Sequence, residues 1–109
     1  MITITQDANV YTMIVHFEIE PAHQQEQIDA IVEFVESVVK HQPGFLSATL
    51  HKSTDGTRIV NYAQWESKAA WQAAFESPAV RAYAKNPFQY AKPDGHDYEV
   101  YHVTDCSEG

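Results

Sequence analysis

Apolar and polar residues alternate in some stretches of the chain and recur every three or four positions in others. Residues 10–19 (VYTMIVHFEI) are rich in β-branched and aromatic side chains, which favours a strand. Pro21 suits the first turn of a helix, where its missing N–H costs nothing. That helix is predicted from one apolar face at three-and-four spacing: Ile28, Ile31, Val32, Val35 and Val38 or Val39. Polar residues cover much of its other side, namely Gln24, Gln25, Glu26, Glu33 and Lys40, and Pro43-Gly44 ends it.

The middle of the chain predicts a hairpin followed by a helix. Residues 45–53 alternate between apolar and polar types, and residues 57–66 form a second strand-like run. Asp55-Gly56 between them favours a tight turn, because glycine accepts the positive φ that such a turn needs. Ser67 is a suitable N-cap for a helix that carries Trp71, Ala74 and Phe75 on one side.

The last third of the chain predicts a short helix, a loop and a final strand. Ser77-Pro78 begins the helix, which includes Val80, Tyr83 and Ala84, and the loop holds Pro87, Pro93, Asp94 and Gly95. Residues 96–104 are predicted as the strand. The resulting order, βαββαβ, is that of a ferredoxin-like α+β fold, an antiparallel sheet with helices on one face. We expect one domain over residues 1–109, with its core at residues 10–104.

An open sheet face is the first consequence of this fold. In a strand over residues 57–66 the period of two places Val60 and Tyr62 on the face away from the helices. A chain of 109 residues has little room for both a core and an enclosed pocket. We therefore expect a homodimer in which a second subunit covers that face.

Composition narrows the classes of partner. The chain is 44% hydrophobic and has a formal net charge of −8, with 15 acidic and 7 scattered basic residues. Nucleic acids and anionic membranes are bound by clustered Lys and Arg, so neither is an expected partner. No signal-like or membrane-spanning run is present, and Cys106 is the single cysteine, which together favour a cytoplasmic protein.

The predicted third strand carries the most informative residues. Ile59, Asn61, Ala63 and Trp65 share its helix-facing side. Asn61 is therefore a carboxamide in an apolar wall, where an unpaired polar group costs about 1–3 kcal/mol and needs a partner or a ligand. The alternative is structural: Asn61 is satisfied by backbone or water, and Trp65 is ordinary core.

Trp71 and Arg81 are further candidates. Small residues surround Trp71, and space beside an aromatic wall suits a planar ligand, although ordinary packing is the alternative. From its place on the predicted short helix alone, Arg81 is expected to be an ordinary surface arginine. The six histidines do not cluster at ligand spacing, so no metal site is expected, and the chain has no phosphate-binding loop or nucleophile motif.

Three runs in residues 43–66 and just beyond, PGF-SAT, STDGT and NYAQWES, resemble the antibiotic biosynthesis monooxygenase family. The resemblance covers roughly residues 10–85 and is strongest to the cofactor-free anthrone oxygenases of aromatic polyketide pathways. It implies a dimeric αβ barrel with a pocket in each subunit, and a role in oxygenation for Asn61 and Trp65. Arg81 matches an arginine of the family, with less secure spacing. Trp71 stands where the family has a pocket tyrosine, which leaves a phenolic proton role there in doubt.

The resulting hypothesis is a cofactor-independent monooxygenase. It would oxidise a small electron-rich aromatic (an anthrone, naphthol or quinol) to a quinone with O2, without metal, flavin or haem. Asn61 and Trp65 would donate hydrogen bonds, Arg81 would stabilise the substrate anion, and Trp71 and Phe75 would bind the ring system.

Three alternatives stay open: a haem-degrading relative, a non-enzymatic binding module for a small aromatic, and a quinol oxidase of stress metabolism. The haem ligand of such relatives has no counterpart here, because the matching helical positions hold Ala74 or Phe75 and Ala84.

Overall fold

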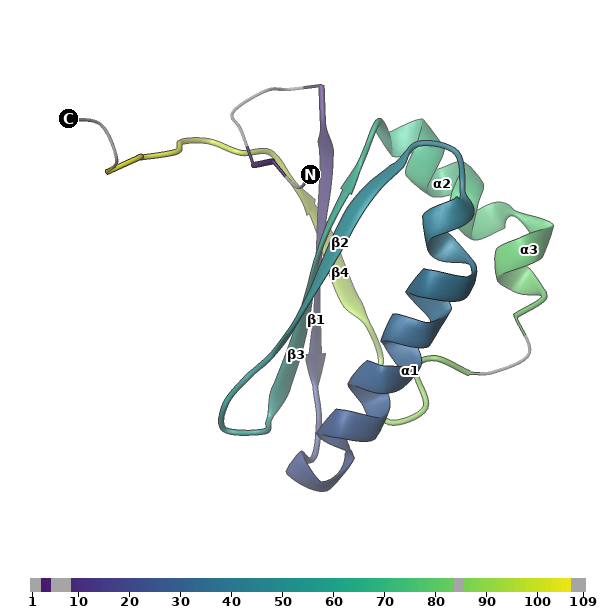
Figure 1. Ribbon diagram of the computed structural model, residues 1–109, viewed down its shortest axis with the longest axis vertical. Helices are drawn as coiled ribbons and strands as arrows, with labels where there is room; N and C mark the ends of the chain where they lie inside the picture. Colours follow the sequence, from purple (N-terminus) through teal and green to yellow (C-terminus); the bar gives the residue numbers. More distant parts are fainter. Residues whose placement is uncertain (1–2, 5–8, 84–85, 107–109) are drawn as a thin grey trace.

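One antiparallel sheet and a layer of helices make up the protein. The computed structural model describes residues 3–4, 9–83 and 86–106. The strands are β1 (Tyr11–Glu18), β2 (Phe45–Lys52), β3 (Arg58–Trp65) and β4 (Asp94–Tyr98), in the sheet order β2-β3-β1-β4. The helices are α1 (Gln24–Ser37), α2 (Lys68–Glu76) and α3 (Pro78–Arg81), with short 3-10 turns at Pro21–His23 and Val39–His41. All three lie on the same side of the sheet, which confirms the predicted ferredoxin-like arrangement (Figure 1).

Helix α1 packs on the sheet through a face that differs in part from the predicted one. Ile28 and Ile31 are buried as expected, but Val32 is 41% exposed and Phe34 is buried instead. Phe34 lies three positions after Ile31 and so shares its face, whereas Val32 is rotated by about 100° from Ile31. Gln24, expected on the polar side, is also buried, and its Nε2 donates to the backbone oxygens of Ser53 and Arg58 at 3.0 and 2.9 Å.

The predicted β2–β3 hairpin is confirmed, and its turn is held by one carboxylate. Gly56 has φ +83°, the positive value expected of it. Asp55 Oδ1 accepts hydrogen bonds from the Thr57 amide at 3.0 Å, the Thr57 hydroxyl at 2.7 Å and the Ser53 hydroxyl at 2.8 Å. These bonds, those of Thr57 first, stabilise the charged form and lower the pKa of Asp55 to about 2.

Serine caps begin both C-terminal helices. The Ser67 hydroxyl accepts from the Ala70 amide at 3.0 Å, as predicted, and the Ser77 hydroxyl accepts from the Val80 amide at 3.2 Å. The short helix α3 ends at Arg81. Ala84, predicted to continue it, lies outside the described residues.

The final strand differs from the prediction. Residues 96–104 were expected to form it, but β4 spans Asp94–Tyr98, and all five residues are exposed. Within the part of the chain that the structure describes, it pairs with β1 alone, from Thr12 opposite Tyr98 to His16 opposite Asp94. Because β1 begins at Tyr11, the register leaves no residue of β1 opposite the chain beyond Glu99. The tail leaves Tyr101 90% and Val103 42% exposed.

The core lies between the sheet and the helices in two clusters. One is centred on Met13, Phe34 and Trp65, and the other on Phe17, Ile31 and Ile59. On the opposite, open face of the sheet, Val60 and Tyr62 are only partly buried. Among the described residues no helix is long and apolar enough to span a bilayer.

Candidate active site

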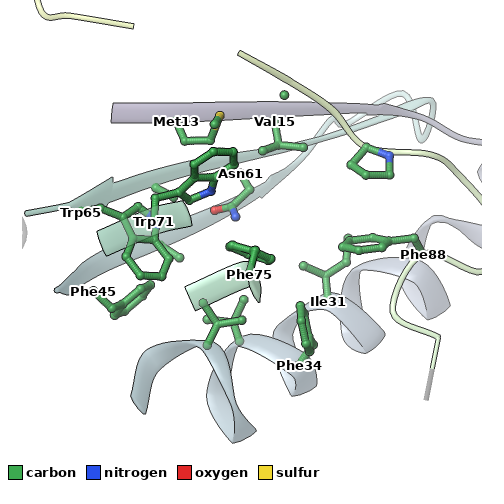
Figure 2. A pocket seen from close by; sticks show the side chains of 16 residues that line it. Met13, Val15, Ile31, Phe34, Phe45, Asn61, Trp65, Trp71, Phe75 and Phe88 are labelled. Atoms are coloured by element: carbon green, nitrogen blue, oxygen red, sulfur yellow. The ribbon is translucent and has the colours of Figure 1, made fainter. Parts of the chain in front are cut away.

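A cavity of about 340 Å³ lies between the sheet and the helices. Asn61, Ala63 and Trp65 reach it from β3, because alternate side chains of a strand point to the same face. The cross-strand register adds Met13 opposite Ala63 and Val15 opposite Asn61, both from β1. Figure 2 shows Met13, Val15, Asn61 and Trp65 converging on one space. Asn61 and Trp65 therefore line the same cavity, as the sequence predicted.

The other walls come from α1 and the 3-10 turn after it, from β2 and α2, and from β4 and the chain before it. Both predicted ligand-binding residues, Trp71 and Phe75, line the cavity from α2. The sequence interpretation missed several further lining residues, namely Ile31, Phe34, Val35, Val39, Phe45, Ala48, Pro93 and Gly95. Period-two spacing within β1 and β2 could have identified Met13, Val15 and Ala48, since each pairs with a β3 residue of the cavity face.

Asn61 is the polar centre of this apolar wall. Its Oδ1 is buried and has no hydrogen-bond partner, the one such side-chain atom found in residues 3–4, 9–83 and 86–106. The amide points from β3 into the space enclosed by the aromatic residues (Figure 2). A buried acceptor left unpaired costs about 1–3 kcal/mol, so this atom is poised to accept a hydrogen bond from a ligand.

Aromatic contacts hold the indole walls in place. Trp65 is 2% exposed and meets Phe45 edge-on, with ring centroids 5.2 Å apart. Phe75 joins the two indoles, at 6.2 Å from Trp65 and 5.9 Å from Trp71. Such tilted and edge-on pairs fix ring orientation beyond simple area burial. The cavity therefore presents flat, apolar surfaces on several sides, which suits a planar ring system.

Tyr11 extends the aromatic wall toward the edge of the sheet. Its ring lies 5.9 Å from that of Trp71, and its hydroxyl donates to Asp97 Oδ2 at 3.0 Å. Partial burial, followed by the hydrogen bond to the Asp97 carboxylate, raises the pKa of Tyr11 to about 12. The phenol is therefore neutral at ordinary pH. The sequence interpretation had given this residue no role beyond its strand.

Arg81 is not part of the cavity. The structure places it at the end of α3, exposed to solvent and absent from the lining residues. The described lining contains no charged side chain. The predicted charge stabilisation by Arg81 in a dry pocket therefore has no support from its position, since this side chain is exposed and outside the lining. Within the described residues, no three His, Cys, Asp or Glu side chains gather closely enough to hold a metal ion.

The sheet, the single helical layer and the apolar chamber between them define a ferredoxin-like α+β domain with a pocket of ligand size. The sequence profile of the antibiotic biosynthesis monooxygenase family matches residues 10–86. The chain belongs to this family and is a monooxygenase, which confirms the resemblance seen in the sequence.

Named relatives agree with this assignment. The chain is 35% identical over 102 residues to tetracenomycin-F1 monooxygenase of Streptomyces glaucescens, covering 94% of this chain and 91% of that protein. The chain is also similar to a monooxygenase from the gene ActVA-Orf6 of Streptomyces coelicolor, which was solved in complex with nanaomycin D. The two are 30% identical with a TM-score of 0.63, and the match covers 91% of this chain and 96% of that one. SnoaB, a cofactor-independent oxygenase from Streptomyces nogalater, shares the fold at 21% identity and a TM-score of 0.69, over 88% and 97% of the two chains.

Proposed function

We propose that this protein is a cofactor-free monooxygenase that oxidises a small, planar, electron-rich aromatic to a quinone with O2. Anthrones, naphthols and quinols are the substrate classes in question. The observation that carries the proposal is the unpaired, buried Oδ1 of Asn61 in an otherwise apolar chamber. The names of the relatives point the same way, since one is solved with nanaomycin D and another is described as cofactor-independent.

The reaction can be written for an anthrone in its enol form. The enol hydroxyl donates to Asn61 Oδ1, which increases electron density on the ring carbon opposite the hydroxyl. That carbon gives one electron to O2, and the resulting radicals combine to form a carbon–oxygen bond. The enol proton moves to the distal peroxide oxygen, so the ring now carries a carbonyl and a hydroperoxide.

The second step releases water. The hydrogen on the peroxide-bearing carbon leaves as a proton, its bonding electrons form the second carbonyl, and the O–O bond breaks. The hydroxide that departs takes up that proton, so anthrone and O2 give quinone and one water. Both substrate hydrogens end in that water, and no charged base is needed in the cavity, in keeping with its uncharged lining.

The protein contributes position and a dry environment. In this proposal the Asn61 amide N–H and the Trp65 indole N–H donate to the developing peroxide, while Trp71 and Phe75 hold the ring plane. Fixed donors in a water-excluded site count for far more than the same donors in water. Neutral hydrogen bonds here take the place of the cation that the sequence assigned to Arg81.

Oxygen consumption by metal-stripped protein, measured with a panel of anthrones and naphthols, tests the proposal. Asn61→Ala should lower turnover by about a hundred- to a thousandfold, the usual effect of removing one preorganised donor. Trp65→Phe should also lower it, and Gln72→Ala, on the exposed side of α2, serves as the control. Full activity in both Asn61→Ala and Trp65→Phe would refute the proposal, and so would binding of the panel without oxygen uptake.

Arg81→Ala tests whether the reaction needs the Arg81 cation that was predicted from the sequence or only the neutral hydrogen bonds of the present proposal. We expect turnover close to that of the unmodified protein, because the side chain is exposed and outside the cavity. A loss as large as that of Asn61→Ala would restore the role predicted from the sequence.

We also propose that a second copy of the chain covers the open sheet face. Ile14, Val60 and Tyr62 are only partly buried there, and a domain of this size gains from burying them. Light scattering at micromolar concentration should give the mass of a dimer. A purely monomeric species would contradict this.

A further inference from the structure

The segment of residues 86–93, here named the strap, closes one side of the cavity. Phe88 and Pro93, both in the strap, contribute to the lining, and β4 follows directly after it. Figure 1 shows this part of the chain returning past the first half of α1 to reach the sheet. The strap contains neither helix nor strand, so its backbone lacks the hydrogen-bond ladders that hold the other walls.

A single side chain of α1 supplies two of the strap's backbone hydrogen bonds. Gln27 is fully buried, with a relative exposure of 0%. Its Nε2 donates to the Pro87 carbonyl, and its Oε1 accepts from the Tyr90 amide at 2.7 Å. One carboxamide thus binds the strap on both sides of Phe88.

Phe88 is held between these two bonds as a wall of the cavity. Its ring stacks on Phe17 with centroids 5.9 Å apart and meets Phe34 edge-on at 6.2 Å. Outside the cavity, Tyr90 stacks on His23 at 4.1 Å and its hydroxyl donates to Glu26 Oε2 at 3.0 Å. This last hydrogen bond is exposed and worth little, which leaves Gln27 as the main polar anchor.

We propose that Gln27 is a positioning residue that holds the strap closed over the bound aromatic, and that the strap is the wall that opens when ligand exchanges. Segments with few backbone hydrogen bonds are the first to open locally, and the β1 and β3 walls are fully laddered. The inference uses the proposed function for the identity of the ligand, but the closure of the strap stands on the geometry alone.

Two readouts independent of activity test the strap. Both tryptophans of the chain line the cavity, so acrylamide quenching of the intrinsic fluorescence reports on access to it. Hydrogen exchange at the Tyr90 amide reports directly on its bond to Gln27. Gln27→Leu should increase Tyr90 exchange about tenfold, as expected for the loss of a buried hydrogen bond of roughly 1.4 kcal/mol. Gln25→Leu, two residues earlier on the exposed side of α1, is the matched control and should change neither readout.

Gln27→Glu makes the closure depend on pH. Protonated, the introduced carboxyl can still donate to Pro87 and accept from Tyr90; ionised, it loses the donor and repels the carbonyl. Burial raises the pKa of such a group, so the strap should be closed at about pH 5 and open at about pH 8. The described titratable groups around this position are His23 in the 3-10 turn before α1, Glu26 on α1 and Tyr90 on the strap. The unmodified protein, measured alongside, accounts for their titration.

Release of 1-naphthol, followed by stopped-flow fluorescence, links the strap to ligand exchange. Its dissociation should be about tenfold faster in Gln27→Leu, and in Gln27→Glu only at the higher pH. The inference is overturned if Tyr90 exchange and acrylamide quenching in Gln27→Leu and Gln27→Glu match those of the unmodified protein at both pH values. It is also overturned if exchange rises equally in β1 and β3, since that would mark a purely structural role. Failure of 1-naphthol to be oxidised would count against the proposed function and leave these strap readouts intact.

Discussion

Replacing Asn61 by leucine should make the protein more stable and less active at the same time. The side chain of Asn61 projects from β3 into the apolar chamber, and its buried Oδ1 has no partner. Leucine has a similar size and no polar atom, so the substitution removes the unpaired acceptor without opening a hole. It also removes the group on which the proposed oxidation depends.

The gain in stability follows from the cost of the unpaired atom. A buried acceptor without a partner lowers the free energy of unfolding by about 1–3 kcal/mol. In a domain of roughly this size, each kcal/mol moves the midpoint of thermal unfolding by about 4–8 °C. We therefore expect Asn61→Leu to raise that midpoint by about 4 °C or more, against the usual tendency of single substitutions to destabilise.

Urea unfolding followed by circular dichroism is the assay, with Asn61→Ala as the companion variant. Alanine also removes the acceptor but enlarges the cavity, so its gain should be smaller or absent. The dependence on urea should stay the same in all three proteins, because the surface exposed on unfolding hardly changes. If Asn61→Leu unfolds at lower urea concentration than the unmodified protein, Asn61 stabilises the fold and the reasoning that makes it a ligand-binding group is wrong.

Three further predictions concern the frame around the site. The pKa of Tyr11 is raised from 10.0 to about 12, so its contribution to stability is present below pH 10 and is lost as the pH rises toward 12. Tyr11→Phe should remove this part of the alkaline unfolding, which circular dichroism follows. The pKa of Asp55 is lowered from 3.8 to about 2, so its contribution to stability is present above pH 3.8 and is lost as the pH falls toward 2. An Asp55→Asn variant whose acid unfolding is unchanged would contradict this. Gly44 has φ +87°, and a Cβ there would lie 2.5 Å from that of Ala70. Gly44→Ala should therefore lower the free energy of unfolding in urea by about 1–2 kcal/mol from backbone strain, and by a further amount from the clash with Ala70. The double variant that adds Ala70→Gly should recover only the part due to the clash.

The sequence predicts the site best where local periodicity determines which way a side chain points. Alternation along residues 57–66 is enough to bring Ile59, Asn61 and Trp65 to the helix-facing side, and the structure confirms that face. The N-cap Ser67 then sets the start of α2 and with it the approach of Trp71 to the same space. Each step depends on residues close in the chain.

The rest of the site depends on contacts that no local pattern contains. Arg81 was matched by spacing, but whether a side chain enters a cavity depends on how α3 packs, and this one is exposed. Likewise the apolar and aromatic residues at 96–104 have strand propensity, yet β4 ends at Tyr98, where the register leaves only one further residue of β1, Tyr11.

Buried carboxamides show why partners, and not burial, separate structural from functional residues. Gln24 binds the carbonyls of the β2–β3 hairpin, Gln27 binds the strap, and Gln64 accepts from the Ser47 hydroxyl and donates to a backbone oxygen at 2.8 Å in each case. All three lie in polar or mixed stretches of sequence, and all three find their partners inside the protein. Asn61 carries the same chemical group, and its Oδ1 is buried although the residue as a whole is only partly buried; that oxygen has no partner. A fold able to satisfy three amides and leaving the fourth open toward an apolar chamber points to a ligand as the missing partner.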